Sequence, residues 1–334
     1  MKKCFLLFGT LIFLSSCTTP EAVSTARMLG GSSQALLYMG CRAVSGTSVE
    51  FEFSQAVTIK RLIFEPEISI ASIEDGSTVK VTLEESAEPG SLITVDLLAE
   101  DENNNSINVL VSFRARNSRM PGLIINEICT EYSKPKTEYI EFKMKTDGNL
   151  GAMRVIIMGN TNSSSQTIYE FQPVEVKEND YVVLHLRTVD ENARDEYGIN
   201  IDESGGSNAS ASARDFWIPG SSKLIHKEAA AIYVLDQSDD VLAAVMISSD
   251  TNPWWNKDYF AEAANFLFSR NAWQSPDGQR GGPADAVRST GTTNTRTICR
   301  DETAENTNTR ADWYVTVTSG ATAGRPNNPN RYSN

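Results

Sequence analysis

The chain has 334 residues, with 30 Lys and Arg against 43 Asp and Glu, which gives a formal net charge of −13. That length is enough for about two domains, since a typical domain has ~150 residues, and 40% hydrophobic with 22% charged residues is typical of a folded chain. The acidic balance argues against a general nucleic-acid binder, because neutralising phosphates needs concentrated Lys and Arg.

The first seventeen residues are typical of an exported, lipid-anchored protein. A basic start precedes an apolar run over 4–14, which is too short to anchor stably across a bilayer. The sequence LSSC over 14–17 resembles the lipobox of bacterial lipoproteins. That resemblance implies a signal peptide over 1–16 and a diacylglycerol on the Cys17 thiol, and two or three acyl chains would give a stable anchor. A plain secretory signal cleaved nearby is the alternative.

A lipid anchor would place the mature chain in the cell envelope. Thr18 and Thr19 follow Cys17, where many enterobacterial lipoproteins of the inner membrane carry Asp, so we expect the outer membrane of a diderm bacterium. The stretch after Cys17 is rich in Thr, Ser, Ala and Gly. Residues 17–35 are therefore predicted to be the lipidated N-terminus and a flexible tether.

The next part of the chain shows the period of two that is typical of half-buried strands. Apolar and polar residues alternate over 49–53, 79–83, 93–97 and 107–113. Turn-forming residues separate these stretches, and no helical pattern lies between them. Short strands at this spacing predict a small β-sandwich over 36–118, and this stretch is similar to bacterial Ig-like domains.

The second part of the chain contains several landmarks in register. A hydrophobic strand ends in Asn126-Glu127, the sequence EYIE follows at 138–141, and the chain closes with SGATAGRPN over 319–327. These resemble the lamin-tail domain, an Ig-like sandwich family, with Thr322-Ala323-Gly324 in place of the family's Thr-Pro-Gly. The resemblance implies a second β-sandwich over 122–329, interrupted by two long insertions at 187–222 and 250–294. The predicted fold class is therefore all-β, with two tandem Ig-like β-sandwich domains.

The insertion at 250–294 holds the densest aromatic cluster of the chain. Residues 258–270 have a helix-compatible composition, so a short helix is predicted there. Exposed aromatic side chains could bind a protein or a glycan, and the candidate ligand-binding residues are Trp254, Trp255, Tyr259 and Trp273. The other interpretation is that they form a satellite core at one end of the sandwich. We favour it, because aromatic residues at helical spacing usually face inward.

The cysteines and acidic loops suggest no metal site or cofactor. Cys41, Cys129 and Cys299 remain after the first two Cys, and no Cys or His spacing is typical of zinc. Cys129 and Cys299 could form a disulfide, since both fall in the second predicted domain. Three buried, unpaired thiols are the alternative. The acidic loops lack the ligand spacing of a calcium loop and are predicted to be solvated turns.

The sequence contains little that is typical of an enzyme. His185 lies in an apolar strand, His226 is the only other His, and no nucleophile elbow or phosphate-binding loop is present. We therefore expect a lipid-anchored extracytoplasmic binding, adhesion or interaction protein without catalytic activity. Its partners would be the membrane, through the lipid, and a protein or glycan ligand, with no nucleic acid. The alternatives are a carboxylate-dependent hydrolase of envelope polysaccharide, which needs two facing carboxylates, and a purely structural envelope lipoprotein.

Overall fold

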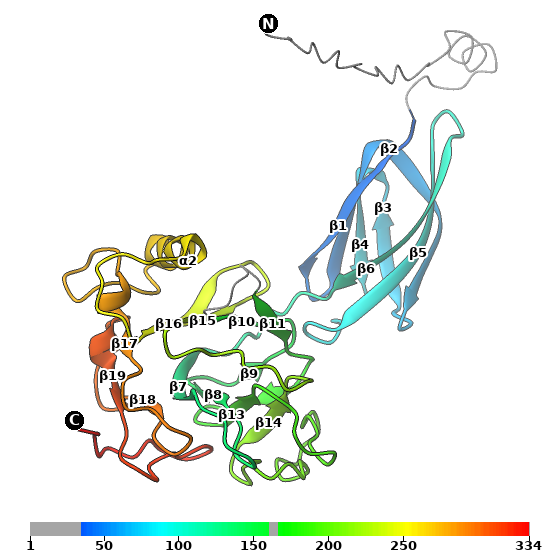
Figure 1. Ribbon diagram of the computed structural model, residues 1–334. Coiled ribbons are helices and arrows are strands. Elements are labelled where there is room, and N and C mark those ends of the chain that lie inside the picture. Colours follow the sequence, from blue (N-terminus) through cyan, green and yellow to red (C-terminus); the bar gives the residue numbers. More distant parts are fainter. Residues whose placement is uncertain (1–34, 160–165, 334) are drawn as a thin grey trace, which may run out of the picture. The chain divides into compact units, whose positions relative to one another are not determined.

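The computed structural model describes residues 35–159 and 166–333 (Figure 1). The predicted signal peptide 1–16, the lipidation site Cys17 and nearly all of the tether lie outside the described residues. The described fold is all-β, as the sequence predicted, and α2 (Asp258–Ser269) is its one α-helix. No helix within these described ranges is long and apolar enough to cross a membrane.

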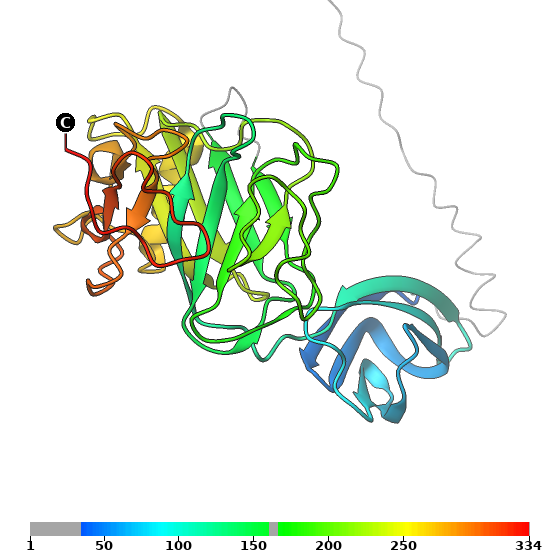
Figure 2. The same cartoon turned by 90° about the horizontal axis from the view of Figure 1, so that it is seen from below.

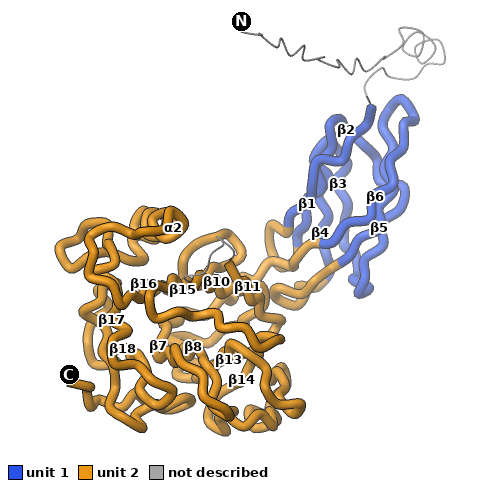
Figure 3. The backbone as a smooth tube through the Cα atoms, in the orientation of Figure 1, with its two compact units in different colours: residues 1–42, 48–84, 94–112 blue, residues 43–47, 85–93, 113–334 orange. Residues whose placement is uncertain are grey.

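The chain divides into two compact units (Figure 3). The first contains Ser48–Glu84, Thr94–Ser112 and the chain up to Arg42. The second contains Ala43–Thr47, Glu85–Ile93 and Phe113–Asn334. Most of the predicted domain 36–118 therefore falls in the first unit and all of 122–329 in the second.

The first unit is built from one six-stranded sheet in the order β3-β4-β2-β5-β6, with β1 also on β2. Its strands are β1 (Tyr38–Ser45), β2 (Ser48–Glu65), β3 (Ile70–Glu74), β4 (Gly76–Leu83), β5 (Leu92–Asp101) and β6 (Ser106–Arg114). The long β2 pairs with β4 over 48–52 and with β5 over 57–65, with a shift of register between. One strand thus serves both halves of a sheet that rolls over its own apolar face (Figure 2).

The alternation in the sequence explains this sandwich-like packing of the first unit. Phe51, Val79, Val95 and Leu97 are fully buried, while the residues beside them along each strand face outward. Apolar β-branched and aromatic side chains favour such a half-buried, pleated surface. The period of two therefore determines which face of the sheet carries the apolar side chains and becomes the buried inner face.

The second unit is a β-sandwich of two larger sheets. One sheet has the order β11-β10-β15-β16-β17, the other has β14-β13-β8-β7-β18-β19, and β12-β9 forms a small ribbon. The strands are β7 (Leu123–Cys129), β8 (Tyr139–Met144), β9 (Gly148–Asn149), β10 (Arg154–Gly159), β11 (Thr167–Glu170), β12 (Glu175–Val176), β13 (Tyr181–His185), β14 (Arg214–Trp217), β15 (Ala229–Leu235), β16 (Val241–Ser248), β17 (Val287–Arg288), β18 (Ile298–Arg300) and β19 (Trp313–Val315). Two short 3-10 helices, Pro283–Asp285 and Arg310–Asp312, complete it.

The core of this unit lies between the two sheets and continues beneath α2. Phe142, Phe171 and Phe216 pack edge to face in its centre, and all seven residues of β15 are buried. Figure 1 shows why, because α2 covers the face of β15 and β16 that points away from the other sheet. The buried stripe of α2 is Phe260, Ala263, Ala264 and Leu267.

Both predicted insertions contribute regular structure. The insertion 250–294 forms α2, close to the predicted helix over 258–270, and then β17. The insertion 187–222 contributes β14, which runs parallel to β13 and pairs Val182–His185 with Arg214–Trp217. The sequence did not predict this parallel pairing, because the long acidic loop before β14 carries no periodicity.

Candidate functional site

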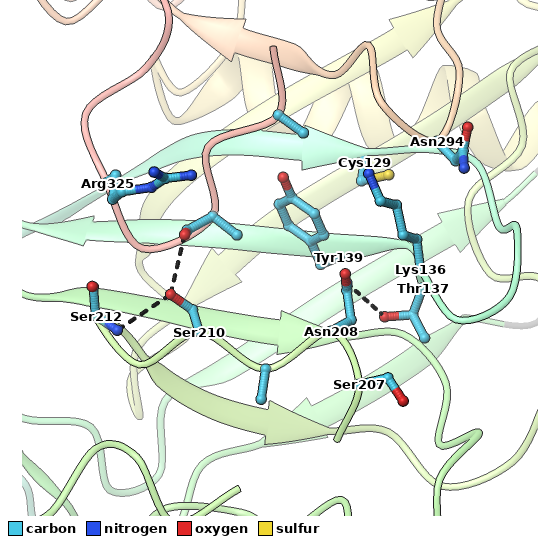
Figure 4. Close-up of a pocket in the computed structure, with 13 residues that line it drawn as sticks. Cys129, Lys136, Thr137, Tyr139, Ser207, Asn208, Ser210, Ser212, Asn294 and Arg325 are labelled. Carbon is cyan, nitrogen blue, oxygen red and sulfur yellow. Dashed lines mark hydrogen bonds between the residues drawn. The ribbon is translucent and has the colours of Figure 1, made fainter. Parts of the chain in front are cut away.

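A pocket of about 400 Å³ opens at one end of the second unit (Figure 4). Cys129 at the end of β7 and Tyr139 at the start of β8 lie beneath it, and Lys136 and Thr137 come from the loop that joins these strands. The insertion 187–222, Asn294 and the C-terminal loop supply the remaining walls. Segments far apart in the sequence therefore meet here.

The wall of this pocket carries positive charge in an acidic chain. Lys136 and Arg325 are both exposed, and among the described residues neither side chain has a hydrogen-bond or ion-pair partner. Their nitrogen-bearing ends point toward Tyr139 from opposite sides (Figure 4). The other lining residues are Ser, Thr, Asn, Ala, Cys and Tyr, with no Asp or Glu among them. An anionic group entering the pocket would therefore meet two cations whose charge no carboxylate already neutralises.

The rim of the pocket is held in place by hydrogen bonds. Asn208 donates its side-chain amide to Thr137 Oγ1 at 3.3 Å, and the Ser210 hydroxyl donates to the carbonyl of Ala323 at 3.1 Å. The main-chain N–H of Ser210 also donates to Asp215 Oδ2 at 2.7 Å. These bonds fix the segment 207–210 against the sheet and the C-terminal loop.

A buried Thr-His-Asp chain lies below the rim. His185 Nε2 is 2.7 Å from Asp215 Oδ1, and His185 Nδ1 is 3.1 Å from Thr137 Oγ1. Because an ionised carboxylate only accepts, a neutral His185 donates from Nε2 and accepts the Thr137 hydroxyl proton at Nδ1. All three residues have no exposed surface, and the imidazole stacks on Trp217 at 3.8 Å. The arrangement ties the loop before β8 to β13 and β14, and it leaves the Thr137 hydroxyl inaccessible in this structure.

Two carboxylates are buried beside the pocket. Glu127 and Glu141 pair directly across β7 and β8, and both are fully buried. Burial raises the pKa of Glu127. Burial, and then the charge of Glu127, raises the pKa of Glu141 well above its usual value. Burial and the same carboxylates also raise the pKa of Tyr139.

These carboxylates hold the C-terminal loop. The N–H of Thr322 donates to Glu127 Oε1 at 3.1 Å, and the N–H of Gly324 donates to Glu141 Oε2 at 2.6 Å. Asn126 donates to Glu141 Oε1 at 2.8 Å and receives, at its carbonyl, the side-chain amide of Asn327 at 3.0 Å. The separate sequence landmarks thus form one hydrogen-bond network. The sequence identified these residues but gave no sign that they meet.

The four aromatic residues predicted to bind a ligand lie in different environments. Trp254 is 71% exposed, whereas Trp273 is only 2% exposed and belongs to the core of the unit. Trp255 is partly buried and donates its indole N–H to the carbonyl of Gly281 at 3.2 Å. Tyr259 packs against Phe260 with ring centres 4.7 Å apart. Trp255, Tyr259 and Trp273 therefore pack in or against the core, as the satellite-core interpretation expects. Ligand binding by Trp254 stays a prediction.

In the described part of the chain, Cys41, Cys129 and Cys299 are free thiols, as the second alternative predicted, but Cys41 is only partly buried. Cys129 and Cys299 are buried. Because Cys299 lies opposite Glu127 in the β7–β18 ladder, Cys129 and Cys299 are not directly paired. Burial raises the pKa of Cys129 to about 12 and also raises the pKa of Cys299. Within the described part of the chain, no group of three or more His, Cys, Asp or Glu residues is placed to hold a metal ion.

Comparison with known proteins assigns most of the second unit to a protein family. A family model described as TP_1001_2nd, protein second domain, matches residues 121–315, which is more than half of the chain. The chain belongs to this family. The matched range covers most of the second-unit sandwich, and the pocket-lining residues Ala321, Ala323 and Arg325 of the C-terminal loop lie beyond it.

Two relatives illustrate the range of similarity. An uncharacterized protein of Treponema pallidum (strain Nichols) is 30% identical over 127 residues, which cover 36% of this chain and 32% of that protein. The chain thus matches about a third of the length of this relative. A DUF4876 family protein from Bacteroides thetaiotaomicron, known from a crystal structure, has 12% identity and a TM-score of 0.32 over 83% of this chain and 94% of that one. That score is too low to assign a shared fold.

Proposed function

We propose that this chain is a lipid-anchored extracytoplasmic binding protein without catalytic activity, located in the outer membrane of a diderm bacterium. The sequence LSSC over 14–17, directly after a short apolar run, supports export and lipidation. The proposal includes an Ig-like first unit and a lamin-tail-like second unit. The second assignment is supported by the network that joins the landmark residues Glu127, Glu141 and Gly324.

The ligand that we propose is an anionic glycan held in the pocket of Figure 4. The observation that carries this proposal is the pair of unpartnered cations, Lys136 and Arg325, on a wall without carboxylates in a chain of net charge −13. The hydroxyl and amide groups around them suit sugar oxygens. A protein ligand would be better served by a wall with large apolar anchors, which dominate binding energy at protein interfaces.

The hydrolase alternative receives less support from the same geometry. Glycoside hydrolysis needs two carboxyl groups that flank the substrate, and no Asp or Glu is among the residues that line this pocket. Glu127 and Glu141 are fully buried and already accept hydrogen bonds from Thr322 and Gly324. Two other carboxylates near the rim, Asp190 and Asp215, already accept hydrogen bonds from the lining residues Ser207 and Ser210. We therefore propose binding rather than hydrolysis.

A glycan array that contains acidic and neutral saccharides tests the proposed ligand, with the chain from residue 18 onward as the probe. The double variant Lys136→Ala/Arg325→Ala should lose binding to acidic glycans by about 100-fold or more, since a hydrogen bond to a charged group contributes about 1.5–3 kcal/mol. The matched control is Lys80→Ala/Lys145→Ala, which removes two exposed lysines elsewhere. Binding to no glycan, or an equal loss in the control, would overturn the proposal.

The anchor is tested separately by detergent phase partition of the full chain expressed in a diderm host. The unchanged chain should enter the detergent phase and co-fractionate with the outer membrane, and Cys17→Ala should stay in the aqueous phase. Aqueous partition of both proteins would remove the lipid from the proposal and leave the pocket untouched.

A further inference from the structure

A second pocket, of about 500 Å³, lies beside β17 and β19 of the second unit. These are the last strands of the two sheets, β17 pairing only with β16 and β19 only with β18 within the described sheets. The lining residues that matter here are Arg288, Arg310, Arg331, Trp313, Tyr314 and Tyr332. A pocket of this size lies in the range that suits a small ligand, about 300–1,000 Å³.

This pocket is also cationic, since three arginines and no Asp or Glu line it. Arg288 donates to the main-chain carbonyls of Asp250 and Ser249, and Arg310 donates to the carbonyl of Ala284. A carbonyl carries no full negative charge, so neither guanidinium is hydrogen-bonded to a carboxylate. The Asn252 N–H, and to a smaller extent the charge of Arg288, lower the pKa of Asp250, so Arg288 is partly compensated by that carboxylate. Arg310 donates only to the Ala284 carbonyl.

The third arginine, Arg331, already contacts two other side chains. Arg331 forms an ion pair with Asp301 at 2.6 Å and lies over the ring of Tyr314, 4.8 Å from its centre. Each guanidinium has five N–H donors in a planar fork, so all three arginines retain donors for an incoming oxyanion. Carboxylates and phosphates match that fork geometrically.

The aromatic wall contains a polar group without an acceptor. Trp313 is only 7% exposed, and its indole Nε1–H has no hydrogen-bond partner among the described residues. Its ring belongs to the core of the unit, and the guanidinium of Arg300 lies over the ring, 5.4 Å from its centre. Buried donors in folded proteins are almost always paired, so an orphaned one calls for an explanation.

We propose that this pocket binds an acidic sugar, a saccharide ring that carries a carboxylate or a phosphate. The anionic group would accept hydrogen bonds from Arg288 and Arg310, and a ring oxygen or hydroxyl would accept the Trp313 indole N–H. Arg331 lies over the ring of Tyr314 and Arg296 over the ring of Tyr332, so the sugar would contact the opposite face or the edge of either ring. Donors dominate the polar groups of this wall, which favours a ligand rich in acceptors. The site is independent of the pocket in Figure 4.

Titration of the chain from residue 18 onward, labelled with ¹⁵N in its tryptophans, tests this proposal. This chain keeps every described residue of both units, and its five Trp give five indole signals. The signal that disappears in Trp313→Phe is that of Trp313. It should shift saturably with glucuronate, with glucose 6-phosphate or with both, and glucose and acetate alone should produce a much weaker effect. The two acids distinguish a carboxylate from a phosphate as the anionic group.

Two variants measure the contributions of the named groups by calorimetry. Trp313→Phe keeps an aromatic ring in the core and removes the indole N–H together with the five-membered ring. Arg310→Ala removes an exposed cation. Measured in the Lys136→Ala/Arg325→Ala background, so that the pocket of Figure 4 does not contribute, each should weaken binding of the acidic sugar by about tenfold, which is about 1.4 kcal/mol. Lys80→Ala, at an exposed position of the first unit, should leave the affinity unchanged. The proposal is overturned by the absence of saturable binding to either acid, by glucose binding as tightly as the acids, or by affinities that neither variant changes.

Discussion

Trp254 and Trp273 lie in the same insertion, but their replacement by Ala should change the free energy of unfolding by very different amounts. Trp273 is 2% exposed in the core, and Trp254 is 71% exposed. A buried aromatic side chain removes about 150–250 Å² from water, which at about 25 cal/mol per Å² corresponds to about 4–6 kcal/mol. Residual burial in the unfolded chain lowers this by roughly 10–40%. Trp273→Ala should therefore lower the free energy of unfolding by about 3–5 kcal/mol, and Trp254→Ala should change it by less than about 0.5 kcal/mol.

Urea unfolding followed by tryptophan emission measures this difference for one unit at a time. The five tryptophans are Trp217, Trp254, Trp255, Trp273 and Trp313, and all of them belong to the second unit. Their emission therefore reports the unfolding of that unit without a contribution from the first, which avoids the usual difficulty of chains with more than one cooperative unit. Similar losses in the two variants, or a loss below about 1 kcal/mol for Trp273→Ala, would refute the packing described here.

Two further predictions concern the network under the C-terminal loop, and both use the same urea assay. The pKa of Glu141 is raised in the fold above its usual value of 4.5, so the folded state binds more protons than the unfolded state above that pH and the contribution of Glu141 to stability falls as the pH rises. Glu141→Gln should therefore flatten the pH dependence above about pH 4.5, and an unchanged slope would contradict this. Gly324 has φ +78°, and a Cβ there would lie 2.2 Å from Ser210 Oγ, whereas Gly220 has φ +101° with no atom within 4 Å. Gly324→Ala should therefore destabilise the unit by more than the ~1–2 kcal/mol that a left-handed conformation costs an L-residue, and more than Gly220→Ala. Equal losses would show that the loop adapts.

The parts of the fold that the sequence predicted are those set by local periodicity. Alternation over 79–83 and 93–97 marks β4 and β5, and helical spacing over 258–270 marks α2. Alternation over 49–53 marks only the start of β2, because the shift of register after Glu52 breaks the period while the strand continues to Glu65. Long-range pairing, such as β13 with β14, depends on contacts that no local pattern records.

The candidate site was less predictable for a related reason. Its walls are mainly short polar side chains from separate loops, and such residues are equally common in ordinary turns. Aromatic content drew attention instead to the insertion 250–294, but composition does not tell which side of a helix faces the core until the neighbouring sheet is known. Trp254 and Trp273 flank α2 rather than lie on it, so helical spacing does not show that Trp273 is buried and Trp254 exposed. The cations Lys136 and Arg325 become informative only when their lack of partners is visible.

The C-terminal loop links the residues that build the fold to those that line the pocket of Figure 4. Along this loop, Thr322 and Gly324 turn their N–H groups down to Glu127 and Glu141. The intervening Ala323 and the following Arg325 line the pocket. Anchoring on both sides of Ala323 fixes the backbone from which the Arg325 side chain extends. A ligand that binds Arg325 therefore meets a backbone ordered in advance, and a preordered loop reduces the entropy lost on binding.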